Sequence, residues 1–141
     1  MAVRFAVLLL LPISAFAQQP ARRDSYVQSE RDIAVTQPGP HEGGGTTTAF
    51  PFFDNATGFD TVFRKRVLHP GSTIGEHVND KDEIYYVVEG RGVLTLNGRK
   101  QTMSAGDAVL TRNGDSHALA PTGDEDLTII VVYPKKPVVQ R

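Results

Sequence analysis

Two histidines, a glutamate and an asparagine are spaced in this sequence so that they could bind one metal ion. His77 and Asn79 are two residues apart, so their side chains leave the same face of an extended strand. A short polar turn follows and would fold the carboxylate of Glu83 back toward them, and His117 lies beyond a second turn that contains glycine. Nitrogen and oxygen ligands without a thiolate suit iron, manganese, nickel, zinc or copper. The spacing therefore predicts a site for one divalent transition metal.

The glycines around these residues form two motifs. Residues 71–90 read G-x5-H-x-N-x3-E-x6-G, and residues 106–117 read G-x5-R-N-G-x2-H. This pattern resembles the two motifs of the cupin family, and the resemblance extends over about residues 61–133. Asn79 stands where that family usually has a second histidine, and Arg112 stands where it usually has a proline.

The resemblance implies a fold, a metal site and a partner. The fold would be a double-stranded β-helix, the jelly-roll barrel of the cupins, with the motif residues at its mouth. The metal ligands would be His77, Glu83 and His117, with Asn79 as a weak fourth ligand. Cupins are commonly dimers, formed through edge strands and amino-terminal arms, so the resemblance also implies a homodimer.

The rest of the chain independently indicates an all-β fold. Asn97-Gly98 is a strong signal for a two-residue hairpin. Short runs of β-branched and aromatic residues, separated by glycine and proline turns, are typical of a sandwich or barrel, and no helical period accompanies them. We expect strands at residues 62–69, 83–89, 93–96, 100–103, 108–111 and 126–133.

Three segments divide the chain. Residues 1–17 combine an early arginine, an apolar run and a small-residue cleavage site, which predicts a secretory signal peptide and a periplasmic or secreted protein. Residues 18–48 are polar and contain proline and glycine, so we interpret them as an arm or linker in which His41 is solvated. Residues 49–141 form the expected cupin domain.

Composition excludes several kinds of partner. The formal net charge of -1 argues against a nucleic-acid-binding surface. The absence of cysteine means that an exported domain would use no disulfide. No membrane partner is expected once the signal peptide is removed, which leaves a small-molecule ligand or substrate as the expected partner.

Three further side chains have candidate roles near the predicted site. Tyr85 shares the face of Glu83 by strand alternation, so it is either the catalytic acid or base or a core tyrosine. Arg64 and Arg66 share one face of a strand, where we expect them to face solvent, although inward-facing arginines could meet an anionic group inside the barrel.

These observations leave two classes of function open. Two neutral histidines and one carboxylate give a divalent ion a net charge of about +1 and open positions that attract anionic or chelating oxygen donors. The slightly favoured hypothesis is a metal-dependent enzyme that acts on a small oxygen-rich carbohydrate or organic acid by isomerase, lyase or dioxygenase chemistry. The alternative is a module that binds such a molecule without turning it over.

Overall fold

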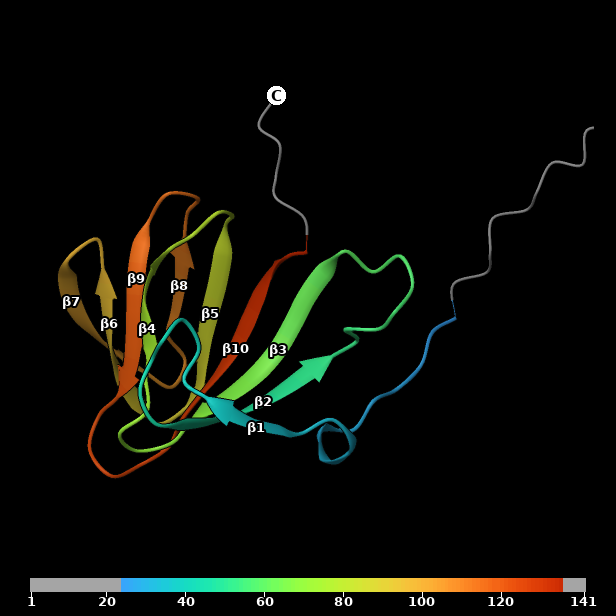
Figure 1. Cartoon of the computed structure of the whole chain (residues 1–141), viewed down its shortest axis with the longest axis horizontal. Helices are drawn as coiled ribbons and strands as arrows, with labels where there is room; N and C mark the ends of the chain where they lie inside the picture. Colours follow the sequence, from blue (N-terminus) through green and yellow to red (C-terminus); the bar gives the residue numbers. More distant parts are fainter. Residues whose placement is uncertain (1–23, 136–141) are drawn as a thin grey trace, which may run out of the picture.

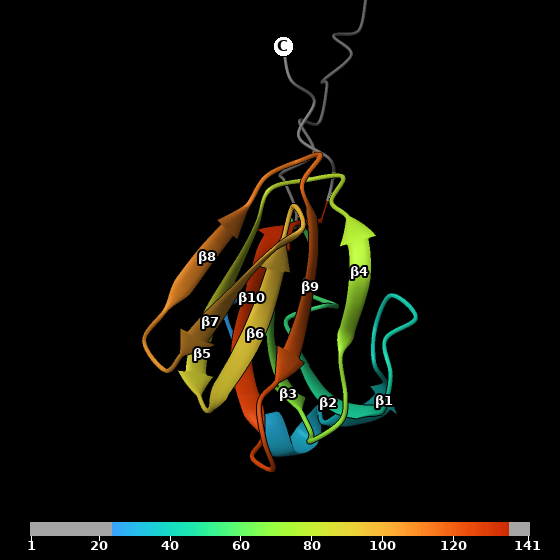
Figure 2. The same ribbon diagram turned by 90° about the vertical axis from the view of Figure 1, so that its left-hand side faces the viewer.

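Two antiparallel sheets face each other and form a barrel (Figures 1 and 2). A computed structural model describes residues 24–135, in which one short 3-10 helix, η1 (Glu30–Asp32), precedes the strands. The six-stranded sheet has, in spatial order, β1 (Val35–Pro38), β2 (Thr46–Phe52), β3 (Thr61–Leu68), β10 (Leu127–Pro134), β5 (Glu83–Glu89) and β8 (Ala108–Thr111). The four-stranded sheet has β4 (Ile74–Val78), β9 (Ser116–Pro121), β6 (Arg91–Leu96) and β7 (Arg99–Ser104).

This architecture confirms the predicted all-β double-stranded β-helix. The strands expected at residues 83–89 and 108–111 have the predicted bounds, and the other four expected strands differ by one or two residues. Strands β1, β2, β4 and β9 were not among the six expected ranges, although His77 on β4 was expected to lie on an extended segment. Strands β1, β2 and β9 each contain a proline, which removes a backbone donor and makes a run of residues a poor strand candidate in the sequence. No helix in residues 24–135 is long and apolar enough to cross a membrane. The predicted signal peptide lies outside the described residues.

Strand alternation separates the core from the surface. On β5, Glu83, Tyr85 and Val87 are buried, whereas Ile84 and Tyr86 are 43% and 44% exposed. The space between the sheets is filled largely by aliphatic side chains, and burying each one is worth about 1.5–3 kcal/mol. The most deeply buried of them are Leu68, Val87, Leu94, Leu119, Leu127 and Ile129. The same alternation therefore points both the core side chains of β5 and the carboxylate of Glu83 into the barrel.

The β1–β2 loop (residues 39–45) is bound to the start of β4. The backbone N–H of Thr73 donates to the carbonyl of Gly44 (2.9 Å), and the N–H of Gly75 donates to the carbonyl of Pro40 (3.0 Å). The two segments approach so closely that a Cβ atom on Gly43 would overlap the carbonyl oxygen of Thr73. Part of the segment expected to be an arm is thus joined both to the six-stranded sheet and to a strand of the other sheet.

Candidate metal centre

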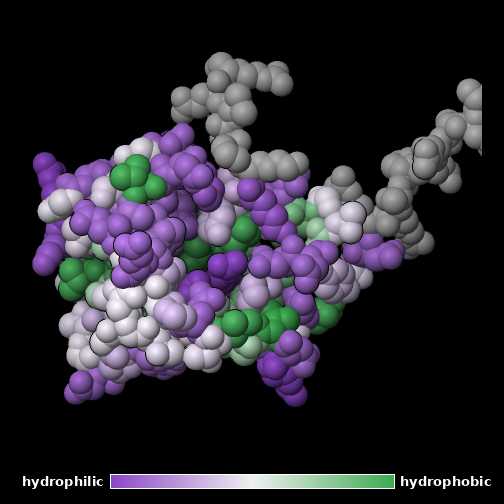
Figure 3. All heavy atoms as spheres, viewed as in Figure 1, coloured by the Kyte–Doolittle hydropathy of each residue, from purple (hydrophilic) through white to green (hydrophobic). Residues whose placement is uncertain are grey.

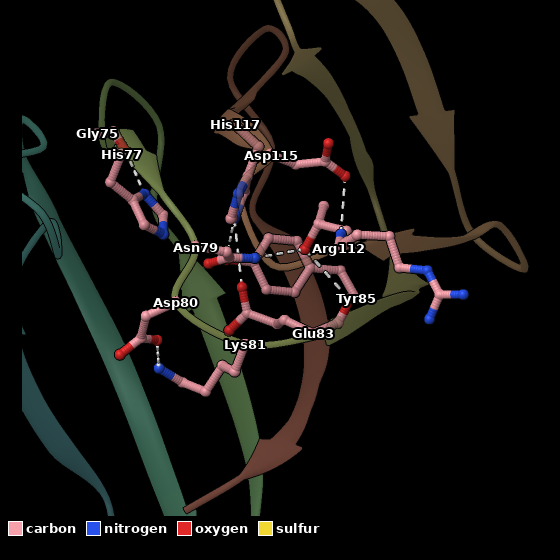
Figure 4. Close-up of polar contacts among 11 residues, drawn as sticks. Gly75, His77, Asn79, Asp80, Lys81, Glu83, Tyr85, Arg112, Asp115 and His117 are labelled. Carbon is pink, nitrogen blue, oxygen red and sulfur yellow. Dashed lines mark hydrogen bonds and ion pairs between the residues drawn. The ribbon is translucent and has the colours of Figure 1, made fainter. Parts of the chain in front are cut away.

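The two predicted histidine ligands face each other across one strand pair. His77 on β4 and His117 on β9 are direct partners in the antiparallel register, and their ring centroids are 4.3 Å apart. Glu83 reaches them from the start of β5, in the other sheet (Figure 4). One nitrogen of each histidine and one carboxylate oxygen of Glu83 all lie within 4.8 Å of one another. The structure therefore brings together two imidazoles and a carboxylate that could hold one ion.

The orientation of His77 suits a ligand. Its Nδ1–H donates to the carbonyl of Gly75 (2.8 Å), which leaves the lone pair of Nε2 free. Burial lowers the pKa of His77 below its ordinary value and outweighs the hydrogen bond to Gly75, which raises it, while the neighbouring His117 adds to the lowering. The net direction favours the neutral imidazole that a metal requires.

One carboxylate oxygen of Glu83 lacks a hydrogen-bond donor. Its Oε2 atom is buried, lies 3.3 Å from Nε2 of His117 and accepts no hydrogen bond within the described part of the chain. An ionised oxygen in such a place is costly unless a cation neutralises it. This unsatisfied atom, together with the nitrogen and oxygen donor set, shows that the residues present fit a divalent transition metal.

Asn79 presents an oxygen to the same space. The single hydroxyl proton of Thr111 is donated to the backbone carbonyl of Glu83 (3.3 Å), so the Thr111 oxygen accepts from Nδ2 of Asn79 (2.6 Å). The amide oxygen of Asn79 then lies on the side of His77 and Asp80 (Figure 4). Its service as a fourth ligand remains a prediction.

Tyr85 lies directly beside the ligands. Its hydroxyl is 3.0 Å from Nε2 of His117, and the residue is only 3% exposed. Burial raises the pKa of Tyr85 well above its ordinary value, and the negative charge of Glu83 raises it further. The phenol therefore keeps its proton near the site. Its catalytic role also remains a prediction.

His41 is exposed, as expected, but it also packs against the candidate site. Its ring stacks on that of His77, with centroids 3.5 Å apart and planes 6° apart, while the residue as a whole stays exposed. The backbone at His41 and Glu42 has φ values of 55° and 61°, a conformation that residues other than glycine rarely adopt. The prolines and glycines of this segment predicted an arm or linker, but they gave no signal that it packs against β4.

Two neighbouring cavities surround the cluster. The outer one has a volume of about 330 Å³, and Figure 3 shows hydrophilic atoms around a hollow between the two sheets. It is lined by His41, His77, Val78, Asn79, Asp80, Lys81, Glu83 and Tyr133. The inner one has a volume of about 70 Å³ and shares His41, Glu83 and Tyr133 with the first. The ligand cluster therefore lies where a small molecule could reach it.

Arg66 faces the inner cavity, so its predicted exposure to solvent was wrong. The residue is 4% exposed, and Arg64 lines the same cavity. Strand alternation places Arg66 on the same face of β3 as the buried Val62 and Leu68, the face that points into the barrel. Nη1 of Arg66 donates to the hydroxyl of Thr47 (2.8 Å) on β2, which satisfies part of the buried guanidinium. Burial and the charge of Arg64 lower the pKa of Arg66.

Relatives of this chain include proteins that bind or act on small acids. An oxalate-binding protein of Thermotoga maritima is 39% identical over 72 residues, which cover 50% of this chain and 60% of that protein. A 5-nitrosalicylic acid 1,2-dioxygenase of Bradyrhizobium is 28% identical over 68 residues, which cover 48% of this chain and 33% of the dioxygenase. The chain thus matches less than two thirds of the length of each relative.

Solved structures agree with the fold. The crystal structure of a predicted oxalate decarboxylase from Thermotoga maritima has a TM-score of 0.70 and 29% identity, covering 77% of this chain and 98% of that one. The polyketide cyclase RemF from Streptomyces resistomycificus has a TM-score of 0.68 at 24% identity, covering 82% of each chain, which is a likeness of fold alone. The family model for the cupin domain matches residues 65–133. With these motifs, this barrel and these relatives, residues 65–133 of the chain form a domain of the cupin family.

Proposed function

We propose that this protein holds one divalent transition metal through His77, Glu83 and His117 and uses it to bind a small organic acid. The observation that carries the proposal is the buried, unsatisfied Oε2 of Glu83, which lies beside two imidazoles and a cavity of about 330 Å³. A bound ion would supply Lewis acidity or oxygen activation at the positions that the protein leaves open. Asn79 would offer a fourth, weaker oxygen ligand.

The mouth of the cavity suits an anionic or oxygen-rich molecule. Lys81 lines it, forms an ion pair with Asp80 and has its ammonium group 5.1 Å from the ring centroid of Tyr133. The names of the oxalate-binding protein and of the predicted oxalate decarboxylase favour an organic acid over a sugar. The aromatic acid in the name of the dioxygenase points in the same direction.

Turnover requires a proton donor or acceptor beside the bound acid, and Tyr85 is the candidate. Its phenol is held 3.0 Å from Nε2 of His117 and keeps its proton, so it is suited to donate a hydrogen bond to a bound group. We therefore favour a metal-dependent enzyme with lyase, isomerase or dioxygenase chemistry. A binding module without turnover is the alternative, which the name of the oxalate-binding relative favours.

Metal analysis tests the core of this proposal. Protein purified without a histidine tag should contain about one transition-metal ion per chain by elemental analysis. His77→Ala and His117→Ala should each lose most of it, because removing one of three protein ligands weakens binding strongly. His69→Ala is the matched control, since His69 is hydrogen-bonded to Thr48 and Asp126 and lies outside the group of candidate ligands. Unchanged metal content in both ligand variants would contradict the proposal.

A substrate panel separates the enzyme from the binding module. Metal-loaded protein would be incubated with oxalate, malonate, keto acids, uronates and catechols, with and without oxygen. Product that forms only with oxygen indicates a dioxygenase, whereas product without oxygen uptake indicates a lyase or an isomerase. Binding of one acid without product under any metal would establish the module.

A further inference from the structure

Resting on the proposed metal site, we propose that Arg64 and Arg66 form an anion subsite for the second carboxylate of a small dicarboxylate. The first carboxylate would lie at the group formed by His77, Glu83 and His117. The ligand would thus be recognised at two points, one in each of the two neighbouring cavities.

The placement of the two arginines supports this subsite. They are two residues apart on β3, so both side chains lie on the inner face of the six-stranded sheet. Both line the cavity of about 70 Å³, together with Tyr85. Glu83 lines this cavity and also the larger one, so the arginines lie next to the proposed metal ligands. A small molecule at the metal would have its far end toward them.

Neutral groups hold Arg66 in place without neutralising it. Thr47 accepts from Nη1, and the amide oxygen of Gln37, turned toward the guanidinium, accepts from Nη1 and Nη2 at 2.8 and 2.9 Å. Among residues 24–135, no carboxylate lies within 4.0 Å of a nitrogen of Arg66. A buried cation without a paired anion is costly, so the site favours an anionic ligand.

Arg64 has spare hydrogen-bonding capacity as well. Its Nε atom is buried and has no partner in the described chain. Its one ion pair, from Nη2 to Asp54, is long at 3.4 Å, and the Asp54 side chain is 38% exposed. A carboxylate in the cavity could accept from this unsatisfied donor, and guanidinium groups suit carboxylates because their planar donors match two oxygens.

The charge of the site and the size of the inner cavity both favour a dianion whose two carboxylates are only a carbon or two apart. A divalent ion would add two positive charges to those of the two guanidiniums, against the negative charges of Glu83 and of Asp54, which pairs with Arg64. A dianion neutralises more of this buried positive charge than a monoanion does. The inner cavity of about 70 Å³ has room for a carboxylate and a carbon or two, since a water molecule occupies about 30 Å³ of liquid.

Calorimetric titration of zinc-loaded protein tests the subsite without requiring turnover. Malonate should bind at least about tenfold more tightly than acetate, and Arg64→Gln and Arg66→Gln should each weaken malonate binding by about tenfold to a hundredfold. Acetate binding should change little in both variants. Arg99→Gln is the matched control, because Arg99 is exposed on the β6–β7 hairpin and should leave both affinities unchanged.

Zinc content, measured in every variant, separates the two proposals. If wild-type protein holds no metal, the proposed function and the subsite both fail. If zinc is retained and both arginine variants keep the wild-type affinity for malonate, the subsite alone is wrong. Should Arg66→Gln fail to fold because its guanidinium is buried, Arg64→Gln decides the question, since the Arg64 side chain is 24% exposed.

Discussion

At the scale of single residues, the site depends on which atom each side chain presents. His77 presents Nε2 because its Nδ1–H is held by Gly75, and Asn79 presents oxygen because Thr111 takes its amide nitrogen. Glu83 presents a carboxylate oxygen that has no protein donor. Hydrogen bonds to groups outside the candidate ligands orient His77 and Asn79, as metal sites commonly require. The Glu83 oxygen has no such bond and is left available to an ion.

Replacing Asn79 with histidine should tighten metal binding. Imidazole is a better donor to a transition metal than a neutral amide, so Asn79→His is expected to increase zinc affinity by about tenfold or more. Competition with a chelator of known affinity measures the change. Asn79→Ala provides the opposite comparison, with weaker binding expected. Equal zinc affinity in all three proteins would mean that side chain 79 points away from the ion.

His41 should hold the ring of His77 in its binding orientation. The stacked pair is 3.5 Å apart, so His41→Ala would free one face of the His77 imidazole and should lower zinc affinity several-fold without abolishing binding. His41→Phe keeps an aromatic face and should restore most of that affinity. If His41→Phe is as weak as His41→Ala, the nitrogen atoms of His41 matter and stacking alone is not its role.

At the scale of elements, the site is assembled from both sheets and one loop. Strands β4 and β9 supply the histidines, β5 supplies Glu83 and Tyr85, and β3 supplies the arginines of the inner cavity. The β1–β2 loop adds His41. Strands β1 and β2 lie at one edge of the six-stranded sheet, and β5 lies near the other edge. Strands therefore position the candidate ligands, while one loop packs against His77 through His41.

The close packing of the β1–β2 loop on β4 predicts opposite results for two neighbouring glycines. Gly43→Ala would push a methyl group into the carbonyl of Thr73 and should destabilise the fold by about 1–3 kcal/mol, with weaker zinc binding because His41 is displaced. Gly44→Ala is the control, since its Cβ would meet only one atom at an ordinary 3.8 Å. Thermal unfolding and zinc titration measure both effects. Equal melting temperatures for the two variants would contradict the tight loop contact.

At the scale of the whole molecule, the amino-terminal segment packs onto the barrel and contacts residues of the candidate site. Strand β1 pairs with β2, and Gln37 on β1 and Thr47 on β2 hold the guanidinium of Arg66. His41 lies in the loop that joins these two strands. The segment that looked like an arm thus contributes contacts on two sides of the candidate site.

Export remains a prediction at this scale. A cleaved signal peptide should leave a mature chain that begins at Gln18 or Gln19, because the small residues Ala15 and Ala17 mark the cleavage site. Amino-terminal sequencing or mass spectrometry of protein from a fractionated host would show this directly. An intact Met1 on the native protein would contradict export by this route.

The sequence by itself determined the features that depend on local spacing. Strand alternation was enough to turn Tyr85 to the same inward side as Glu83, because neighbours along a strand have fixed directions. The spacing of the glycines and polar residues, together with the resemblance to the cupin motifs, was enough to predict His77, Glu83 and His117 as a group. Asn97-Gly98 likewise predicted its hairpin, and both residues have positive φ.

Only the tertiary structure decided the features that depend on distant partners. Whether the face of β3 that carries Arg66 points to water or to the interior depends on which face of its sheet the four-stranded sheet covers, and the sequence of β3 alone does not show this. The stacking of His41 on His77 depends on backbone contacts between segments about 30 residues apart, from Pro40 and Gly44 to Gly75 and Thr73. Such contacts are selected by how the whole chain packs, so a single residue's type and neighbours leave them open.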